Sequence, residues 1–100
     1  MAGTEQIKPI EFPFTWKGFV HELIERKGMV CLVKRSKDIY WHYEVVKLRN
    51  LPANEAYGKH FPAHEHYPSP NEWGIDGFTF AAHELEGARK HYRRLCGRVS

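Results

Sequence analysis

Apolar and polar residues alternate through the middle of the chain, which predicts β-strands there. In residues 39–49, the longest alternating stretch, Trp41, Tyr43 and Val45 share one face of the predicted strand. The opposite face carries two polar and then two apolar residues: His42, Glu44, Val46 and Leu48. Because both faces carry apolar side chains, the pattern is typical of a central strand, and it leaves open which face is buried.

Two further segments precede this strand. Residues 29–35 are rich in β-branched side chains and too short for a stable helix, so they predict a strand. Residues 16–27 allow two interpretations, because their apolar side chains also fall at helical spacing. We favour a strand from Phe19 that turns at Lys27–Gly28 into the next strand, since Gly18 disfavours a helix and a Lys-Gly pair suits a tight turn.

The end of the chain changes to a helical period. Residues 77–80 predict a short fourth strand and residues 82–95 a helix. One apolar stripe recurs along this helix at steps of three and four: Ala81, Leu85, Ala88, Tyr92 and Leu95. Between the strands and the helix, residues 50–76 contain repeated prolines and glycines, which predict a long irregular loop.

These elements predict an α+β fold: a three- to four-stranded antiparallel β-sheet packed against one C-terminal α-helix. A chain of 100 residues makes one domain with a thin core. Pro9 and Pro13 prevent a continuous helix near the start, so we expect an extended N-terminal arm over residues 1–15 and a single domain over residues 16–100.

Composition places the chain among globular proteins, since 42% hydrophobic and 14% aromatic residues are too many for a disordered chain. No apolar run approaches the roughly 18 residues of a membrane span, and the first residues lack a signal pattern. Two cysteines are few for a small secreted domain. We therefore expect a cytoplasmic protein without a membrane partner. The net charge of +3 permits a polyanionic partner without requiring one.

The run SPNEWGIDGFTF, residues 69–80, leads into the predicted helix. With the preceding strand pattern it resembles a group of small, functionally uncharacterised proteins encoded in bacteriophage and prophage genomes. The resemblance covers residues 18–95, is most specific over 68–95, and implies a bacterial host cytoplasm. This sequence departs from the pattern at Ala81, where a capping Thr or Ser is expected; Glu84 supplies only the acidic half of a capping box.

Three sets of residues are candidates for chemistry or binding. His60, His64 and His66 have a weak metal-ligand spacing, and a polar loop that is rich in histidine is the interpretation we favour. Cys31, His42 and Glu44 lie on neighbouring predicted strands, but no nucleophile motif, phosphate loop or catalytic carboxylate pair accompanies them. We therefore predict neither an enzyme nor a cofactor or structural metal.

The third set comprises aromatic side chains, which are more numerous than one thin core needs. Aromatic residues outside the core are favoured anchors of protein contacts. The predicted partner-binding residues, in or beside the long loop, are Tyr57, Phe61, Tyr67 and Trp73. For Tyr67 and Trp73 the competing interpretation is a second small core.

Basic residues crowd the last helix and provide an alternative function. Such cations either bind phosphates or complement the helix dipole. The candidates for nucleic-acid binding are Arg89, Lys90, Arg93 and Arg94. Our main prediction is a small phage or prophage accessory protein, a non-enzymatic binding module that engages or inhibits a host protein. The alternative is a nucleic-acid-binding domain, and the oligomeric state is left open.

Overall fold

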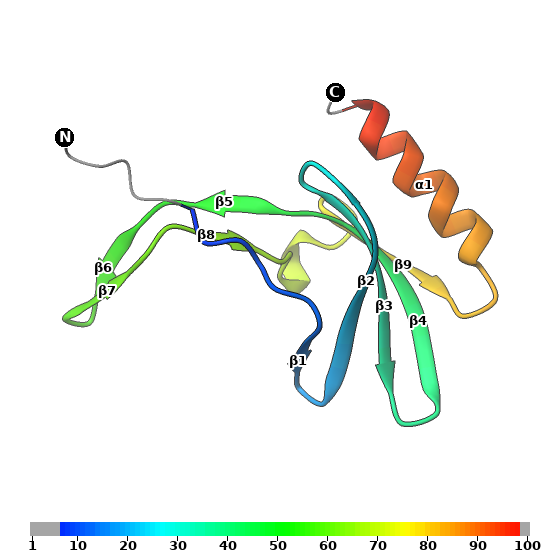
Figure 1. Cartoon of the computed structure of the whole chain (residues 1–100), viewed down its shortest axis with the longest axis horizontal. Coiled ribbons are helices and arrows are strands. Elements are labelled where there is room, and N and C mark those ends of the chain that lie inside the picture. The colour runs from blue at the N-terminus through cyan, green and yellow to red at the C-terminus, as the bar shows by residue number, and fades with distance from the viewer. Residues whose placement is uncertain (1–6, 99–100) are drawn as a thin grey trace.

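A five-stranded antiparallel sheet with one α-helix across one face forms the body of the molecule (Figure 1). The computed structural model describes residues 7–98. Its sheet strands, in spatial order, are β1 (Phe14–Trp16), β2 (Phe19–Lys27), β3 (Val30–Lys37), β4 (Tyr40–Lys47) and β9 (Gly77–Ala81); the helix is α1 (Leu85–Arg98). The predicted α+β class is confirmed, and the sheet has more strands than the three or four predicted.

Within the ambiguous residues 16–27, Phe19–Lys27 form a strand, as we favoured, and Trp16 ends β1. β2 pairs with β3 across the turn at Gly28, whose φ of 60° suits glycine. β3 pairs in turn with β4, so β2, β3 and β4 form the predicted three-stranded meander. The alternation of β2 is interrupted by a β-bulge, where the register with β3 shifts between Leu23 and Glu25.

The prediction of an irregular loop over residues 50–76 is wrong for residues 50–66, whereas residues 67–76 form an irregular connection. Residues 49–66 fold into a long β-hairpin, in which β5 (Arg49–Leu51) pairs with β8 (His64–His66) and β6 (Asn54–Ala56) pairs with β7 (Lys59–Phe61). We call residues 49–66 the arm. Its prolines, Pro52 and Pro62, fall between the paired segments and remove no ladder hydrogen bond. A 3-10 turn, η1 (Pro70–Glu72), follows the arm.

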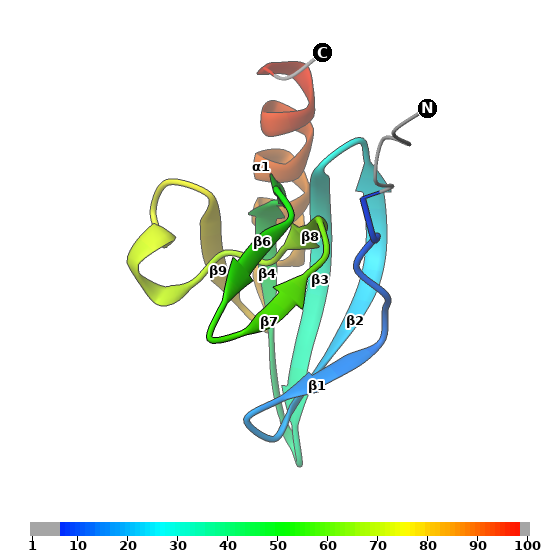
Figure 2. The same ribbon diagram turned by 90° about the vertical axis from the view of Figure 1, so that its left-hand side faces the viewer.

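The arm projects from the sheet face opposite α1 (Figures 1 and 2). At its tip, Tyr57 and Gly58 have φ of 54° and 71°, the two positive values of a type I′ turn. At its base, the N-terminal segment adds a third strand-like contact: the Lys8 amide donates to the Ala63 carbonyl at 2.9 Å and the Glu65 amide to the Lys8 carbonyl at 2.9 Å.

The N-terminal segment is extended, as predicted, but β1 makes residues 14–16 part of the sheet, so the expected boundary at residue 15 falls inside a strand. Residues 1–6 of that predicted arm lie outside the described residues. The predicted strand over residues 39–49 ends at Lys47, since β5 begins a separate ribbon at Arg49.

Each face of the sheet has its own core. The sequence left open which face of β4 is buried, and the structure shows that both are. On one face, Val30, Leu32 and Val45 pack against Ala88, Tyr92, Leu95 and Cys96 of α1. On the other, Cys31, Val33, Val46 and Leu48 are covered by Ile10, Phe12, Met29, Tyr67 and Trp73. Both faces of β4 are therefore covered, one by a helix and the other by irregular segments.

The start of α1 differs from the prediction by one turn. The helix begins at Leu85 rather than residue 82, and the Glu84 carboxylate accepts the Ala81 amide at 2.8 Å, which is the acidic half of a capping box. Leu85 is only half-buried, so the buried part of the predicted stripe begins at Ala88. No helix of residues 7–98 is long and apolar enough to cross a membrane.

The packing of α1 gives a stability prediction. Leu95→Ala removes a side chain that fills the core between the helix and Leu32, so we expect a loss of about 2–4 kcal/mol in the free energy of unfolding, measured by urea denaturation. Ile39→Ala, in an exposed turn, is the control and should change little. Equal effects of the two substitutions would contradict this packing.

Candidate functional site

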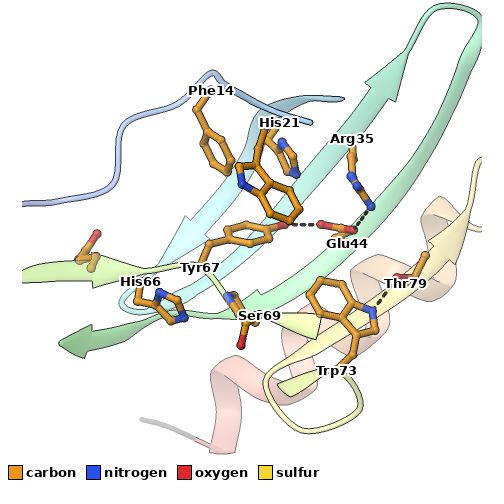
Figure 3. Close-up of a pocket in the computed structure, with 12 residues that line it drawn as sticks. Phe14, His21, Arg35, Glu44, His66, Tyr67, Ser69, Trp73 and Thr79 are labelled. Carbon is orange, nitrogen blue, oxygen red and sulfur yellow. Dashed lines mark hydrogen bonds and ion pairs between the residues drawn. The ribbon is translucent and has the colours of Figure 1, made fainter. Parts of the chain in front are cut away.

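A pocket of about 530 Å³ opens on the sheet face opposite α1 (Figure 3). Its walls come from segments far apart in the sequence: β1, the middle strands of the sheet, and the connection from β8 to β9. The rings that line it are Phe14, Trp16, Tyr67 and Trp73, and we call it the aromatic pocket. Trp16 remains 50% exposed, so one wall is open to solvent.

The inner end of the aromatic pocket is a buried carboxylate, Glu44, which is only 1% exposed. The Tyr67 hydroxyl donates to Glu44 Oε1, Arg35 Nη1 lies 3.4 Å from Oε2, and His42 Nε2 lies 3.2 Å from Oε2. A buried carboxylate without such partners is strongly unfavourable. Glu44 therefore holds the β8–β9 connection onto the sheet through its hydrogen bond with Tyr67. Burial beside this carboxylate raises the pKa of Tyr67 far above its usual value, so the Tyr67 hydroxyl keeps its proton.

Stacked rings form the wall on the β1 side. Phe14 lies parallel to His21, with ring centroids 4.3 Å apart, and the edge of Tyr67 meets His21 at 5.4 Å. Burial lowers the pKa of His21 below its usual value, so this ring is neutral at neutral pH. The wall is accordingly apolar in character although it contains a histidine.

The opposite wall is Trp73, and two contacts fix its position. Its indole Nε1–H donates to Thr79 Oγ1 at 2.8 Å, and its ring lies against the Cα of Gly77, where an added Cβ would come within 2.6 Å of ring carbons. Glycine is therefore required at position 77 for this ring to lie flat on β9. These contacts explain three residues of the SPNEWGIDGFTF run.

The connection that carries Trp73 is stabilised by its own acidic residues. Glu72 accepts hydrogen bonds from the Ser69 hydroxyl at 2.6 Å and the Ser69 amide at 3.1 Å, and these bonds lower the pKa of Glu72 to about 2. Asp76 accepts from Arg49 Nε at 2.6 Å, which joins the connection to the base of the arm. The connection at the rim of the pocket is thus held by hydrogen bonds within itself and by an ion pair with the base of the arm.

Glu65, another lining residue, connects three segments. Arg26 forms a two-bond ion pair with it, at 2.6 and 3.0 Å, and the Ile10 amide donates to it at 3.0 Å. The hydrogen bonds from Arg26, and next the one from Ile10, hold the pKa of Glu65 below its usual value. β2, β8 and the N-terminal segment are therefore clamped together at this carboxylate.

The predicted partner-binding residues divide into two places. Tyr67 and Trp73 line the aromatic pocket and also cover the second core, which combines the two interpretations left open for them. Tyr57 and Phe61 instead lie on the arm, where Tyr57 is 97% exposed. The four residues therefore form no single surface.

The weak metal candidates are distributed along the arm: His60 in β7, His64 and His66 in β8. His66 Nε2 lies 3.3 Å from Glu72 and His64 Nδ1 lies 3.0 Å from the Pro62 carbonyl. Over residues 7–98 no group of three metal-ligating side chains is close enough to hold an ion.

Cys31 is fully buried, and burial raises the pKa of its thiol to about 11. It is therefore protonated at neutral pH and is a core residue beside the aromatic pocket. His42 and Glu44 are in contact, as their position on one face of β4 predicted, but the carboxylate is already occupied by Tyr67 and Arg35.

The basic residues predicted for nucleic-acid binding lie on α1, which covers one face of the sheet (Figure 1), whereas the aromatic pocket opens on the other face. Arg89 forms an ion pair with Glu25 of β2. Lys90, Arg93 and Arg94 are exposed.

Sequence reasoning missed Phe14, Trp16 and His21 as pocket residues. The signal that was available is the regular spacing of Phe12, Phe14 and Trp16, which predicts one face of a strand. Their meeting with Tyr67 depends on the long-range pairing of β1 with β2.

No protein-family model, curated protein or solved structure matches this chain.

The Glu44 network gives a second prediction. Tyr67→Phe keeps the ring but removes the donor to the buried carboxylate, so we expect a loss of about 1–3 kcal/mol in the free energy of unfolding. Tyr40→Phe, at an exposed position, is the matched control and should have almost no effect. Urea denaturation of both variants measures the difference; an unchanged Tyr67→Phe would disprove the role assigned to this hydroxyl.

The Glu65 clamp gives a pH prediction. Its pKa is lowered from the ordinary value of 4.5 in the folded chain, so its contribution to stability is present above that pH and is lost as pH falls through the folded pKa. Glu65→Gln should therefore be less stable at neutral pH and should lose less stability on acidification. Thermal unfolding at pH values on both sides of 4.5 measures this, with exposed Glu86→Gln as control. Parallel pH curves for Glu65→Gln and wild type would contradict it.

Proposed function

We propose that this chain is a non-enzymatic binding module that takes an aromatic side chain of a protein partner into the aromatic pocket. The observation that carries the proposal is the pocket of about 530 Å³ walled by Phe14, Trp16, Tyr67 and Trp73. Ligand sites in proteins typically have volumes of roughly 300–1,000 Å³ and mainly apolar walls. Aromatic anchors that fill such pockets dominate the binding energy of many protein interfaces.

The polar groups of the aromatic pocket support an aromatic occupant over a strongly polar one. Glu44 is occupied by Tyr67, Arg35 and His42, and Glu65 is occupied by Arg26 and Ile10. Thr79 accepts the indole N–H of Trp73. Because the two carboxylates and Thr79 already have partners, a ligand gains mainly by covering the rings and excluding water from them. Two buried polar atoms of the lining, His21 Nδ1 and Arg35 Nε, have no hydrogen-bond partner within residues 7–98.

Charge around the aromatic pocket argues against phosphate as the ligand there. Each of the three arginines beside it, Arg26, Arg35 and Arg49, is in an ion pair with a carboxylate of the same region. Nucleic-acid binding through the exposed cations of α1 remains the alternative prediction, and it concerns the opposite face. The bacteriophage origin and a host protein as partner likewise stay predictions from the sequence.

The test uses N-acetyl-L-tyrosinamide and N-acetyl-L-tryptophanamide as probes in an NMR titration at dilute protein concentration. The chain has three tryptophans, so it has three indole N–H signals. We expect the signals of Trp16 and Trp73 to shift and that of Trp41 to stay. A ligand efficiency of about 0.3 kcal/mol per heavy atom predicts a dissociation constant on the order of 0.1–1 mM.

Matched variants make the result specific. Trp16 and Trp41 are 50% and 46% exposed, and only Trp16 lines the aromatic pocket. Trp16→Ala should weaken probe binding by about tenfold or more, as expected for a contact of at least 1.4 kcal/mol, whereas Trp41→Ala should not. N-acetyl-L-lysinamide should bind more weakly than either aromatic probe. Equal shifts of all three indole signals, or none, would refute the proposal.

A further inference from the structure

The tip of the arm carries a tyrosine in a backbone conformation that tyrosine disfavours. Tyr57 has φ of 54° in a type I′ turn, where asparagine, aspartate or glycine is preferred. Its side chain is 97% exposed, so it gains almost no packing energy within its own chain. A bulky aromatic ring that is strained and fully exposed gains its packing energy only from a contact outside the chain.

The arm around it also lacks a core of its own. β6 and β7 pair only with each other, and a two-stranded ribbon exposed on both faces is marginally stable in water. Phe61 of β7 is a second half-exposed aromatic residue near this tip. A partner that covers the ribbon would stabilise it.

The turn between β6 and β7 lies at the outer end of the arm, far from its base at β5 and β8 (Figures 1 and 2). Glu65, His66 and Tyr67 line the pocket at the arm's base, and Tyr57 is at its tip, ten residues from Tyr67. A two-fold axis that crosses the middle of the arm at right angles therefore places each tip at the base of the other arm. Such an exchange is closed and uses the same contact twice.

We propose that the partner at the aromatic pocket is a second copy of this chain: the arms of two copies run antiparallel and Tyr57 of each enters the aromatic pocket of the other. This inference rests on the proposed function, because it requires the aromatic pocket to accept an aromatic side chain. It assigns a role to the strained turn, to the exposed ring and to the projecting ribbon together.

The surface available is sufficient for a dimer. Taking about 200 Å² for a whole aromatic side chain, the exposed parts of Tyr57, Phe61 and Trp16 come to about 400 Å² per copy. Two copies thus cover about 800 Å² with these three residues, half of a standard interface of about 1,600 Å². The strands β6 and β7, whose residues are exposed except for the partly buried Ala56, are the source of the remaining area in this antiparallel arrangement.

Sedimentation velocity over a range of protein concentrations tests the inference. We expect a monomer–dimer equilibrium in the wild type. Tyr57→Asn gives the turn its preferred Asn-Gly sequence and removes the ring, so it should fold at least as well and raise the dimer dissociation constant by about 100-fold or more. Trp16→Ala, which opens the aromatic pocket, should also weaken the dimer.

The control is Tyr40→Asn, which removes a tyrosine that is 75% exposed on the sheet and not on the arm. It should leave the dimer intact. A wild type that stays monomeric at the highest concentration, or a dimer that Tyr57→Asn leaves unchanged, would overturn the inference.

Probe binding separates this inference from the proposed function. In a dimer, Tyr57 of the partner copy competes with N-acetyl-L-tyrosinamide, so Tyr57→Asn should bind the probe more tightly than wild type at high protein concentration. If the probe binds the aromatic pocket but the wild type is monomeric, the pocket serves a different protein and only the self-association fails. If the probe binds neither wild type nor Tyr57→Asn, the proposed function itself fails.

Discussion

The buried carboxylate of Glu44 is the constraint on which the site depends. It lies in the middle of β4, on the face that it shares with His42 and Val46, and it is 1% exposed. A carboxylate in this position must have donors, and Tyr67, Arg35 and His42 provide them from two strands and one connection. Meeting this requirement brings the β8–β9 connection over the sheet, and with it Tyr67 and Trp73, which join Phe14 and Trp16 of β1 in lining the aromatic pocket.

A sheet covered on both faces explains how so short a chain is organised. A helix covers one face through an ordinary apolar stripe, whereas extended and irregular segments cover the other, with Phe12, Tyr67 and Trp73 supplying the apolar area. Segments of this kind pack less completely than a helix, and ion pairs hold them in place: Arg26 with Glu65, and Arg49 with Asp76. The pocket lies where those segments diverge from the sheet.

The five-stranded sheet with α1 differs from the projecting arm in how it is stabilised, and this difference has a physical origin. The body contains two cores, whereas β6 and β7 contribute no residue to either and are held by their mutual hydrogen bonds, a tight turn and an exposed pair of Glu55 with His60. Prolines at residues 52 and 62 separate that outer ribbon from the pairing of β5 with β8 at the base. Residues that add nothing to the stability of one chain, above all Tyr57, are therefore the ones expected to act between chains.

The sequence by itself determined the α+β class, the meander of β2 to β4, the fourth strand and the final helix, because local period and turn residues specify these elements. It also indicated that His42 and Glu44 share a face. Only the tertiary structure decided that residues 49–66 form a hairpin arm, since Pro52 and Pro62 look like breaks until the pairing partners are known. The aromatic pocket was equally invisible, because Trp16, Tyr67 and Trp73 meet through long-range pairing and a buried hydrogen bond to Glu44, which no local pattern encodes.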